Sequence, residues 1–444
     1  MVRHPTVGFS TADISQGYTK IATMTDYEWA TPNTTMENLT LTKQSNELNE
    51  PALDILEEGL LHKIMLVFDL PTRLPGVFVV GLALLLTALT GASWWLITAD
   101  QAMAQLVMVL LALFMAADMT LLISLPQQKV SYGPWKAQLF VLALPRIVAT
   151  LGLAVLANWL QEDWALWLFL GVQVAGTAAF IWGYFFEPFR LKLSAVMTFT
   201  DRLPLGTDPI RVLHISDLHV ERLTDREARV LELAREANPD LIVISGDYVN
   251  LSYNRDPETL RQVRQLLCQL TAPHGVYATL GSPPVDLRET VVPIFEGLHH
   301  VTLLRHGWQQ VEMGNGRSLT VLGMDCTHDL PVDAGRLARL VSAAPPDMPQ
   351  LLIYHSPELM PEAAEHDIDL YVCGHTHGGQ VRLPLIGPVF TSSQLGRRFV
   401  MGLYKLGRTT LYVSRGIGLE GLSAPRVRFM CPPEMTLITI MPNG

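Results

Sequence analysis

Two histidines separated by a single residue lie in a glycine-rich stretch that follows a short apolar segment. Residues 374–380 read Gly-His-Thr-His-Gly-Gly-Gln, and the apolar segment before them covers residues 368–373. On an irregular turn, His375 and His377 can face the same cavity, and the glycines allow the backbone to approach whatever lies there. Because the neutral imidazole is the commonest metal ligand among side chains, this spacing predicts a metal site.

Three other apolar segments end in a carboxylate or an imidazole. In α/β folds the carboxyl ends of the strands form the site, so we expect these side chains to converge with the two histidines. Mixed carboxylate and imidazole ligation of two divalent ions roughly 3.5–4 Å apart is an arrangement that activates water against phosphate esters. The segments are 213–219, which carries Asp217 and His219, 241–247, which ends in Asp247, and 351–355, which ends in His355.

The order Asp-x-His, Gly-Asp, His and Gly-His-x-His, over about residues 208–442, resembles the calcineurin-like metallophosphoesterase superfamily. The spacing and the Gly-Gly-Gln tail are most similar to its membrane-associated bacterial branch, which includes UDP-2,3-diacylglucosamine hydrolases and related phosphodiesterases. The resemblance implies hydrolysis of a phosphodiester or phosphoanhydride by a metal-bridging hydroxide, with Asp247, His355 and His375 as catalytic residues. It implies one metal site of Asp217, His219, Asp247 and His377, and a second of Asp247, His355 and His375, with Asp247 bridging.

One motif of the superfamily is replaced in this chain. After the apolar segment 275–280 the family has Gly-Asn-His-Asp/Glu, whereas this chain reads Gly-Ser-Pro-Pro, with Ser282 and Pro283 at the asparagine and histidine positions. In the family the asparagine is a ligand of the second metal, and the histidine donates to the phosphate or leaving-group oxygen. Ser282 offers a hydroxyl on a shorter arm, and Pro283 has nothing to donate. Losing one such donor typically costs about 10²–10³ in rate.

We therefore expect a weakened second metal site and slower turnover, with Ser282 as a candidate ligand. His299 or His300 is a conceivable substitute, but the sequence favours both as caps of the following strand. A degenerate relative that binds metal and ligand as a sensor, or that acts as a membrane scaffold, is the competing interpretation. The imidazole and carboxylate donors suit two divalent ions of Mn, Fe, Zn or Co better than Ca. Net charge is −10 and the pI is about 5.7. With no basic and aromatic stripe, the chain is not expected to bind nucleic acid.

A long stretch before these motifs is almost free of charge. Residues 76–186 carry seven charged side chains and contain four apolar runs, at 76–97, 103–125, 138–160 and 164–186. Each run has the length of about 20 residues that crosses a bilayer. This predicts an all-α region of four transmembrane helices and a lipid bilayer as partner, and a small transporter or assembly platform is a further alternative for its role.

The distribution of charge predicts the orientation of these spans. Lysine and arginine flank the first and last spans and lie between the second and third, whereas the other two turns hold only acids. The positive-inside rule then places the catalytic domain on the cytoplasmic side of a bacterial inner membrane. The four cysteines show no ligand spacing, which is typical of a reducing compartment. Inside the spans, Asp118 and Arg146 are predicted to pair, because an unpaired charge there is costly. Snorkelling of Arg146 to the headgroups is the alternative.

The chain is thus expected to have four parts. Residues 1–75 are polar and predicted to be mostly disordered, 76–186 are the four spans, 187–207 a linker, and 208–442 the metallophosphoesterase domain. Beyond residue 208, apolar segments alternate with helical patterns and then give way to strands, which predicts an α/β fold. The resemblance implies a four-layer αββα sandwich. The membrane spans favour a lipid or nucleotide-lipid phosphoester as substrate. The apolar segment 383–390 either contacts acyl chains or is an ordinary turn, and the sequence carries no signal for an oligomeric state.

Overall fold

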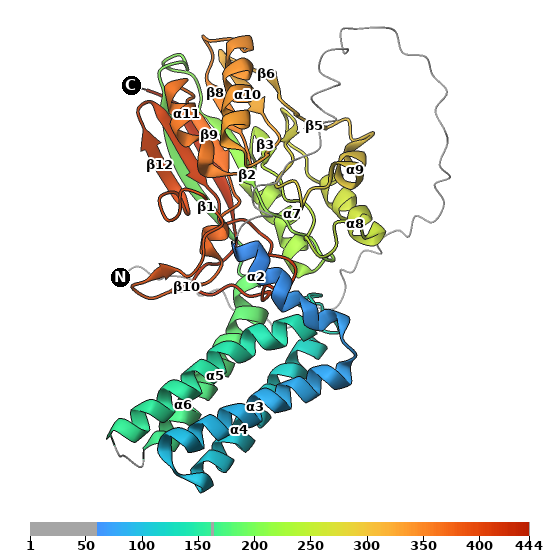
Figure 1. The fold of residues 1–444 in the computed structure, drawn as a ribbon. Coiled ribbons are helices and arrows are strands. Elements are labelled where there is room, and N and C mark those ends of the chain that lie inside the picture. The colour runs from blue at the N-terminus through green and yellow to red at the C-terminus, as the bar shows by residue number, and fades with distance from the viewer. Residues whose placement is uncertain (1–59, 161–163, 444) are drawn as a thin grey trace, which may run out of the picture. The chain divides into compact units, whose positions relative to one another are not determined.

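The computed structural model describes residues 60–160 and 164–443, which belong to one compact unit (Figure 1). Of the polar segment predicted to be disordered, residues 1–59 lie outside the described residues. Its last part is helical, with helix α2 at Leu60–Asp69 and a short 3-10 helix at Leu70–Arg73.

Four long helices follow, at the positions of the four apolar runs. They are α3 (Gly76–Thr98), α4 (Gln101–Ser124), α5 (Trp135–Leu160) and α6 (Ala165–Ile181). All four segments are long and apolar enough to cross a membrane, the last one counted through Phe189. Large apolar side chains stand outward on each of them, for example Leu96 and Trp159, both 78% exposed. Such outward apolar surface suggests association with a membrane.

The two charges predicted to pair inside the spans do so. Arg146 of α5 donates through Nε and Nη2 to the two carboxylate oxygens of Asp118 of α4, over 2.6 and 2.8 Å. Its Nη1 and Nη2 also donate to Gln173 Oε1 and Thr177 Oγ1 of α6, over 2.9 and 2.8 Å. Because Asp118 is 1% exposed and Arg146 7%, the guanidinium is held inside the bundle and does not snorkel outward.

Two six-stranded sheets follow the helices. The first has the order β1-β14-β2-β3-β4-β5, and the second β12-β13-β9-β8-β7-β6. In the first, the run from β2 to β5 is parallel and β14 is antiparallel to β2. In the second, the run from β7 to β13 through β8 and β9 is parallel, and β6 and β12 are antiparallel edges. The strands are β1 (Lys192–Thr200), β2 (Ile210–Ile215), β3 (Leu241–Ile244), β4 (Val276–Ala278), β5 (Val301–Leu303), β6 (Gly307–Gly314), β7 (Arg317–Gly323), β8 (Gln350–Ile353), β9 (Leu370–Cys373), β12 (Gly402–Leu406), β13 (Thr409–Val413) and β14 (Glu434–Pro442).

A strand lies where the sequence predicted a linker. Residues 192–200 form β1, which pairs in parallel with β14 from Lys192 opposite Glu434 to Thr200 opposite Pro442. The partner is more than two hundred residues away, so no local pattern could reveal the pairing. The first sheet therefore begins within the segment 187–207.

The alternation of side chains along the strands builds four layers. Leu213 and Ile242 face helices α7 (Asp225–Ala237) and α8 (Pro257–Leu267), whereas their neighbours Val212 and Val243 face the other sheet. In the same way, Leu352 of β8 packs toward α10 (Leu330–Ala343) and α11 (Met360–Glu365). Both faces of each central strand are buried, which explains the continuous apolar runs of the sequence. Figure 1 shows the helices on the outer faces of the two sheets, so the αββα sandwich is confirmed.

Candidate metal centre

The predicted ligands lie in loops at the carboxyl ends of four central strands. Asp217 and His219 follow β2, Asp247 follows β3, His355 follows β8, and His375 and His377 follow β9. Five of these six residues have a positive φ, between 39° and 67°, and the exception is His355. A non-glycine residue held in this region costs of order 1–3 kcal/mol and is typical of functional sites. Backbone bonds between the loops hold the turns, such as the one from His219 N to Asp247 O, 2.9 Å long.

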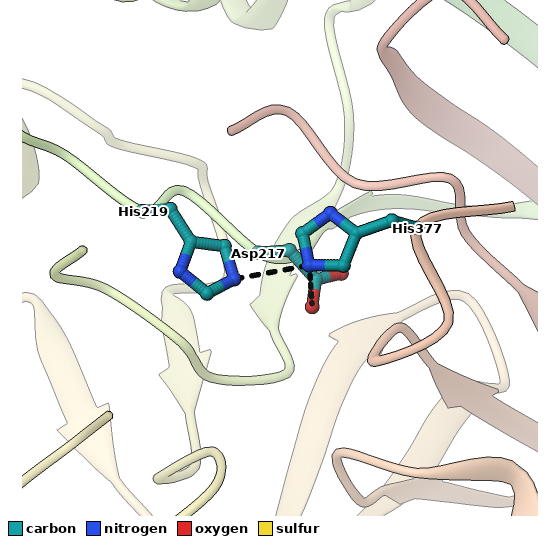
Figure 2. A group of neighbouring side chains, drawn as sticks. All are labelled: Asp217, His219 and His377. Carbon is teal, nitrogen blue, oxygen red and sulfur yellow. Dashed lines mark hydrogen bonds and ion pairs between the residues drawn. The ribbon is translucent and has the colours of Figure 1, made fainter. Parts of the chain in front are cut away.

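The first group of ligand atoms comes from Asp217, His219 and His377 (Figure 2). The Nε2 atoms of the two histidines face each other over 3.1 Å, and His377 Nε2 lies 3.8 Å from Asp217 Oδ1. All three side chains are buried, with at most 5% exposure. Two ring nitrogens this close need a proton or a cation between them, and with the Asp217 carboxylate beside them the three residues could hold a metal ion.

The second group comes from Asp217, Asp247 and His355. Asp247 Oδ2 lies 3.2 Å from His355 Nε2 and 3.3 Å from His219 Nε2. This one oxygen therefore lies between the two groups, in the position of a bridging ligand. His355 Nδ1 lies 2.8 Å from the carbonyl oxygen of Ser245. A proton on Nδ1 satisfies that contact and leaves Nε2 as the atom that faces the site.

His375 lies beside this second group without joining it. Its ring centroid is 5.2 Å from that of His355, and its backbone N–H donates to Asp217 Oδ1 over 2.9 Å. Its Nε2, however, is 3.3 Å from the carbonyl oxygen of Ser392. Its role as a ligand of the second metal remains a prediction.

Ser282 lies at the rim of the second group. Its backbone N–H donates to Asp247 Oδ1 over 2.7 Å, and its side chain is buried. The loop that carries it is held by Asp286, whose carboxylate accepts backbone N–H groups of Asp247 and Gly281, each over 2.8 Å. Sequence reasoning did not single out Asp286, which positions both loops.

The histidines expected as substitutes for the missing motif do not lie at the site. His300 Nε2 is 3.2 Å from the carbonyl oxygen of Leu267, and His299 is exposed. The alternative of a substitute histidine at 299 or 300 therefore does not hold, because the turn before β5 directs both imidazoles away from the loops after β2 and β3.

Two residues that the sequence analysis missed lie beside the predicted ligands. His328 is 3% exposed, and its ring centroid is 4.6 Å from that of His375. Glu420 Oε2 lies 3.5 Å from His377 Nε2. Both follow the carboxyl end of a central strand, β7 and β13 respectively. The same strand-end rule that identified the other ligands could therefore have flagged them.

Burial and charge shift the titration of this cluster in opposite directions. Burial alone would raise the pKa of Asp247, but the neighbouring His355 and His219 hold it well below its usual value. Burial alone would lower the pKa of His355, but Asp247 and Asp217 raise it to about 10. For His377, burial and then the adjacent His219 lower the pKa well below its usual value. The Asp247 carboxylate is therefore kept ionised, and its negative charge would stabilise a cation.

Divalent metal ions fit the donors of this cluster. Four of its buried atoms have no hydrogen-bond partner among the described residues: Asp217 Oδ2, His219 Nδ1, His355 Nε2 and His377 Nδ1. Leaving buried polar atoms unpaired costs about 1–3 kcal/mol each. Carboxylate oxygen and imidazole nitrogen are donors that Mn, Fe, Zn and Co accept. Ligation would satisfy His355 Nε2 directly, whereas His219 and His377 present their Nε2 atoms to the site and keep Nδ1 on the other side of the ring.

Comparison with known proteins agrees with the fold and the donors. The calcineurin-like phosphoesterase family matches residues 210–282. The uncharacterized metallophosphoesterase YkuE of Bacillus subtilis is 30% identical over 287 residues, which cover 61% of this chain and 94% of the relative. The chain belongs to the metallophosphoesterase family and is a metal-dependent phosphoester hydrolase.

Two further relatives have more specific names. The phosphodiesterase YaeI of Escherichia coli is 27% identical over 273 residues, 60% of this chain and 95% of the relative. The UDP-2,3-diacylglucosamine pyrophosphatase LpxG of Chlamydia trachomatis is 23% identical over 323 residues, 60% of this chain and 94% of the relative.

Proposed function

We propose that this protein is a membrane-anchored phosphoesterase that uses two divalent ions to hydrolyse a lipid-linked phosphodiester or phosphoanhydride at the inner face of a bacterial membrane. The observation that carries the proposal is the pair of buried groups of carboxylates and imidazoles, in each of which the ligand atoms lie within 4.8 Å of one another. Asp247 Oδ2 lies between two imidazoles of that cluster, as a bridging ligand requires.

The chain's own groups have distinct roles in this reaction. When bound, two divalent ions supply a nucleophilic water at neutral pH and neutralise phosphoryl oxygens. Asp217 and Asp247 supply the negative charge that holds the ions, and His219, His355 and His377 direct ring nitrogens toward them. Ser245 orients His355, and Asp286 orients the loop of Asp247. Because the loops bury these groups, bulk water does not compete for them.

An exposed apolar hairpin supports a lipid substrate. The strands β10 (Arg382–Leu383) and β11 (Gly387–Pro388) begin two residues after Gln380, at the end of the histidine turn. At its tip Leu385 is fully exposed and Ile386 is 58% exposed, and Phe390, just beyond β11, is 63% exposed. Exposed apolar side chains gathered in this way are typical of membrane or ligand contacts.

Backbone bonds connect this hairpin to the apolar helices. Arg382 N–H donates to the carbonyl oxygen of Phe429 over 2.9 Å. The preceding Arg428 N–H donates to the carbonyl oxygen of Gly183, just beyond α6, over 3.1 Å. Nearby, Cys431 N–H donates to the carboxylate of Glu187. Metal ligands, hairpin and helix end are therefore linked within a few residues, which suits a substrate presented by the bilayer.

The proposed side of the membrane rests on charge. Lys129 lies between the second and third spans and Lys136 in the first turn of the third, and Arg190 and Lys192 follow the fourth, whereas Asp100 lies in the turn between the first and second. By the positive-inside rule, this distribution favours a cytoplasmic catalytic domain.

Hydrolysis by the purified protein in detergent tests the reaction. With Mn²⁺ we expect wild type to hydrolyse bis-p-nitrophenyl phosphate and UDP-2,3-diacylglucosamine, and Asp247→Asn to lose at least about 10³-fold in rate for both. Asp347→Asn is the matched control, since Asp347 is exposed on the loop before β8. A wild type inactive with Mn, Fe, Zn and Co, or an Asp247→Asn variant as active as wild type, would contradict the proposal.

The hairpin separates the lipid part of the proposal from the hydrolase part. Leu385→Ser combined with Ile386→Ser is expected to slow hydrolysis of the lipid-linked substrate in vesicles about tenfold, because about 25 cal/mol per Å² of apolar contact with the bilayer is lost. Turnover of the soluble diester should not change. Leu205→Ser, at a 73% exposed leucine away from the hairpin, is the control. Equal loss for both substrates would remove the argument for a lipid.

A further inference from the structure

The loop that replaces the family motif leaves room at the second metal group. Ser282 is fixed there by its backbone, which donates to Asp247 Oδ1 over 2.7 Å. Its Oγ ends a side chain one carbon shorter than asparagine. The residue at the next position, Pro283, has no donor. A ligand that replaces the missing amide must therefore come from another loop.

His328 occupies the space in front of Ser282. Its Nε2 lies 3.1 Å from Ser282 Oγ, and its ring centroid is 4.6 Å from that of His375 and 6.4 Å from that of His355. The residue follows β7, which pairs in parallel with β8, the strand that ends at His355. Three imidazoles and the serine hydroxyl thus gather on the side of the cluster where the motif is incomplete.

The backbone around His328 is held in place. The residue has φ of +60°, and its carbonyl oxygen accepts a bond from Gln394 Nε2 over 3.0 Å. On either side, Thr327 N–H donates to Asp333 Oδ2 over 2.9 Å and Asp329 caps helix α10 through Val332 N–H. The helix therefore holds a strained turn that directs this imidazole inward.

The surroundings of the ring are those of a ligand. An unpaired ring nitrogen does not by itself mark a ligand, since Nδ1 of His214 also has no partner among the described residues; what distinguishes His328 is the pair of imidazoles beside it. In His328, Nδ1 has no partner among the described residues, and Nε2 has only the serine hydroxyl. The nearest rings are those of two other predicted ligands, His375 and His355. A shared cation is the arrangement that satisfies all of them together.

We propose that the His328 imidazole is a ligand of the second metal ion and takes the place of the amide that the motif lacks. The inference rests on the proposed two-ion hydrolase. Ser282 then has a positioning role, because its hydroxyl holds the ring. An asparagine at position 282 would occupy the space of this imidazole, so the two solutions exclude each other.

Metal binding by the full-length protein in detergent tests this assignment. Metal-free protein is titrated with Co²⁺, and bound ions are counted by elemental analysis while the visible absorption of Co²⁺ reports the ligands. We expect two ions per chain in wild type. In His328→Ala the weaker ion should lose about 10–100-fold in affinity, as metal sites do when a supporting residue is removed, with the tighter ion unchanged.

Two further variants make the test specific. His300→Ala removes an imidazole that bonds Leu267 away from the site, and it should keep both ions. Adding Ser282→Asn to His328→Ala supplies the family's own amide in the vacated space and should restore the second ion to within about threefold of wild type. Ser282→Asn alone should weaken that ion, because the amide and the imidazole collide.

His328→Gln is the control that separates loss of metal from loss of folding. It keeps a polar group beside Ser282 but replaces the imidazole. It should show the same metal loss with an unchanged metal-free unfolding midpoint. Two ions bound by His328→Ala with wild-type affinity and wild-type Co²⁺ spectrum would overturn the assignment and leave the hydrolase proposal standing. A wild type that binds two ions, with the predicted loss in His328→Ala, but hydrolyses no phosphoester would overturn the function and leave the assignment standing.

Discussion

The protein contains two buried clusters of charge that are built in opposite ways. In the helical bundle, Arg146 makes two bonds to Asp118 and further bonds to Gln173 and Thr177. At the carboxyl ends of the strands, the Nε2 atoms of His219 and His377 face each other over 3.1 Å, and Asp247 Oδ2 lies between His219 and His355.

The difference separates a structural cluster from a binding one. A buried ion pair is tolerable when each charge is paired and bonded, and the cluster in the bundle meets that condition by itself. The metal centre does not, because its acids and imidazoles leave ligand atoms directed at one another. It is complete only with cations bound, so function and stability should respond oppositely to mutation in the two places.

The largest expected effect is a loss of hydrolysis when a residue of the metal centre is replaced. Asp217 contributes to both groups of ligand atoms. Asp217→Asn should lower hydrolysis of bis-p-nitrophenyl phosphate by at least about 10³-fold. The metal-free unfolding midpoint should change little, because the amide keeps an oxygen for the backbone N–H of His375. The activity assay measures the loss of hydrolysis, and unfolding followed by circular dichroism measures the midpoint. A large fall in the midpoint would contradict the distinction between a structural cluster and a binding cluster.

Mutation of the ion pair in the helical bundle should lower stability strongly and leave activity unchanged. Removing one partner of a buried pair costs about 3–5 kcal/mol, so Asp118→Asn and Arg146→Gln should each destabilise the protein strongly, and the double variant by less than their sum. Activity per folded molecule should not change. Unfolding in bicelles provides the cycle, with Asp100→Asn as control, since asparagine also caps a helix. Additive costs would contradict the pairing.

A smaller effect on the pH dependence of stability is expected from a buried histidine that is not a predicted metal ligand. His214 lies on β2 outside both ligand groups, with Nε2 2.9 Å from Ser245 Oγ. Burial lowers the pKa of His214 to about 3. The unfolded chain, with a histidine pKa of about 6.5, then binds the extra proton, and stability falls as pH drops from about 6.5 toward 3.

Replacing His214 should reduce the dependence of stability on pH. His214→Asn is expected to reduce the slope by up to about 1.4 kcal/mol per pH unit in this window, visible in unfolding midpoints measured between pH 6.5 and 4. Gln309→Asn, at an exposed residue of β6 that carries no titratable group, should leave the slope unchanged. An identical slope in His214→Asn would mean that other groups carry the acid sensitivity.

Much of the site was predictable because its ligands are tied to strand ends. Asp217, Asp247 and His355 each follow a run of apolar residues, and that pattern is local. The pairing of Asp118 with Arg146 was predictable for a similar reason, since an apolar setting leaves a charge few options.

What could not be predicted depends on contacts between distant segments. His328 follows β7 of the second sheet and Ser282 follows β4 of the first, so their contact depends on how the two sheets pack. Nothing in residues 281–284 indicates which loop supplies the replacement. Strand β1 was taken for a linker because its partner is the last strand of the chain. The contact of His375 Nε2 with the carbonyl oxygen of Ser392 likewise depends on how a later loop folds over the site.

The most direct test of the two-ion centre is anomalous diffraction from crystals of the protein grown with Mn²⁺. The account predicts two peaks roughly 3.5–4 Å apart. One should lie among Asp217, His219, Asp247 and His377, and the other among Asp247, His355, His375 and His328. A single peak in the first group, or density for an ion in neither, would contradict the claim that this cluster holds a metal pair.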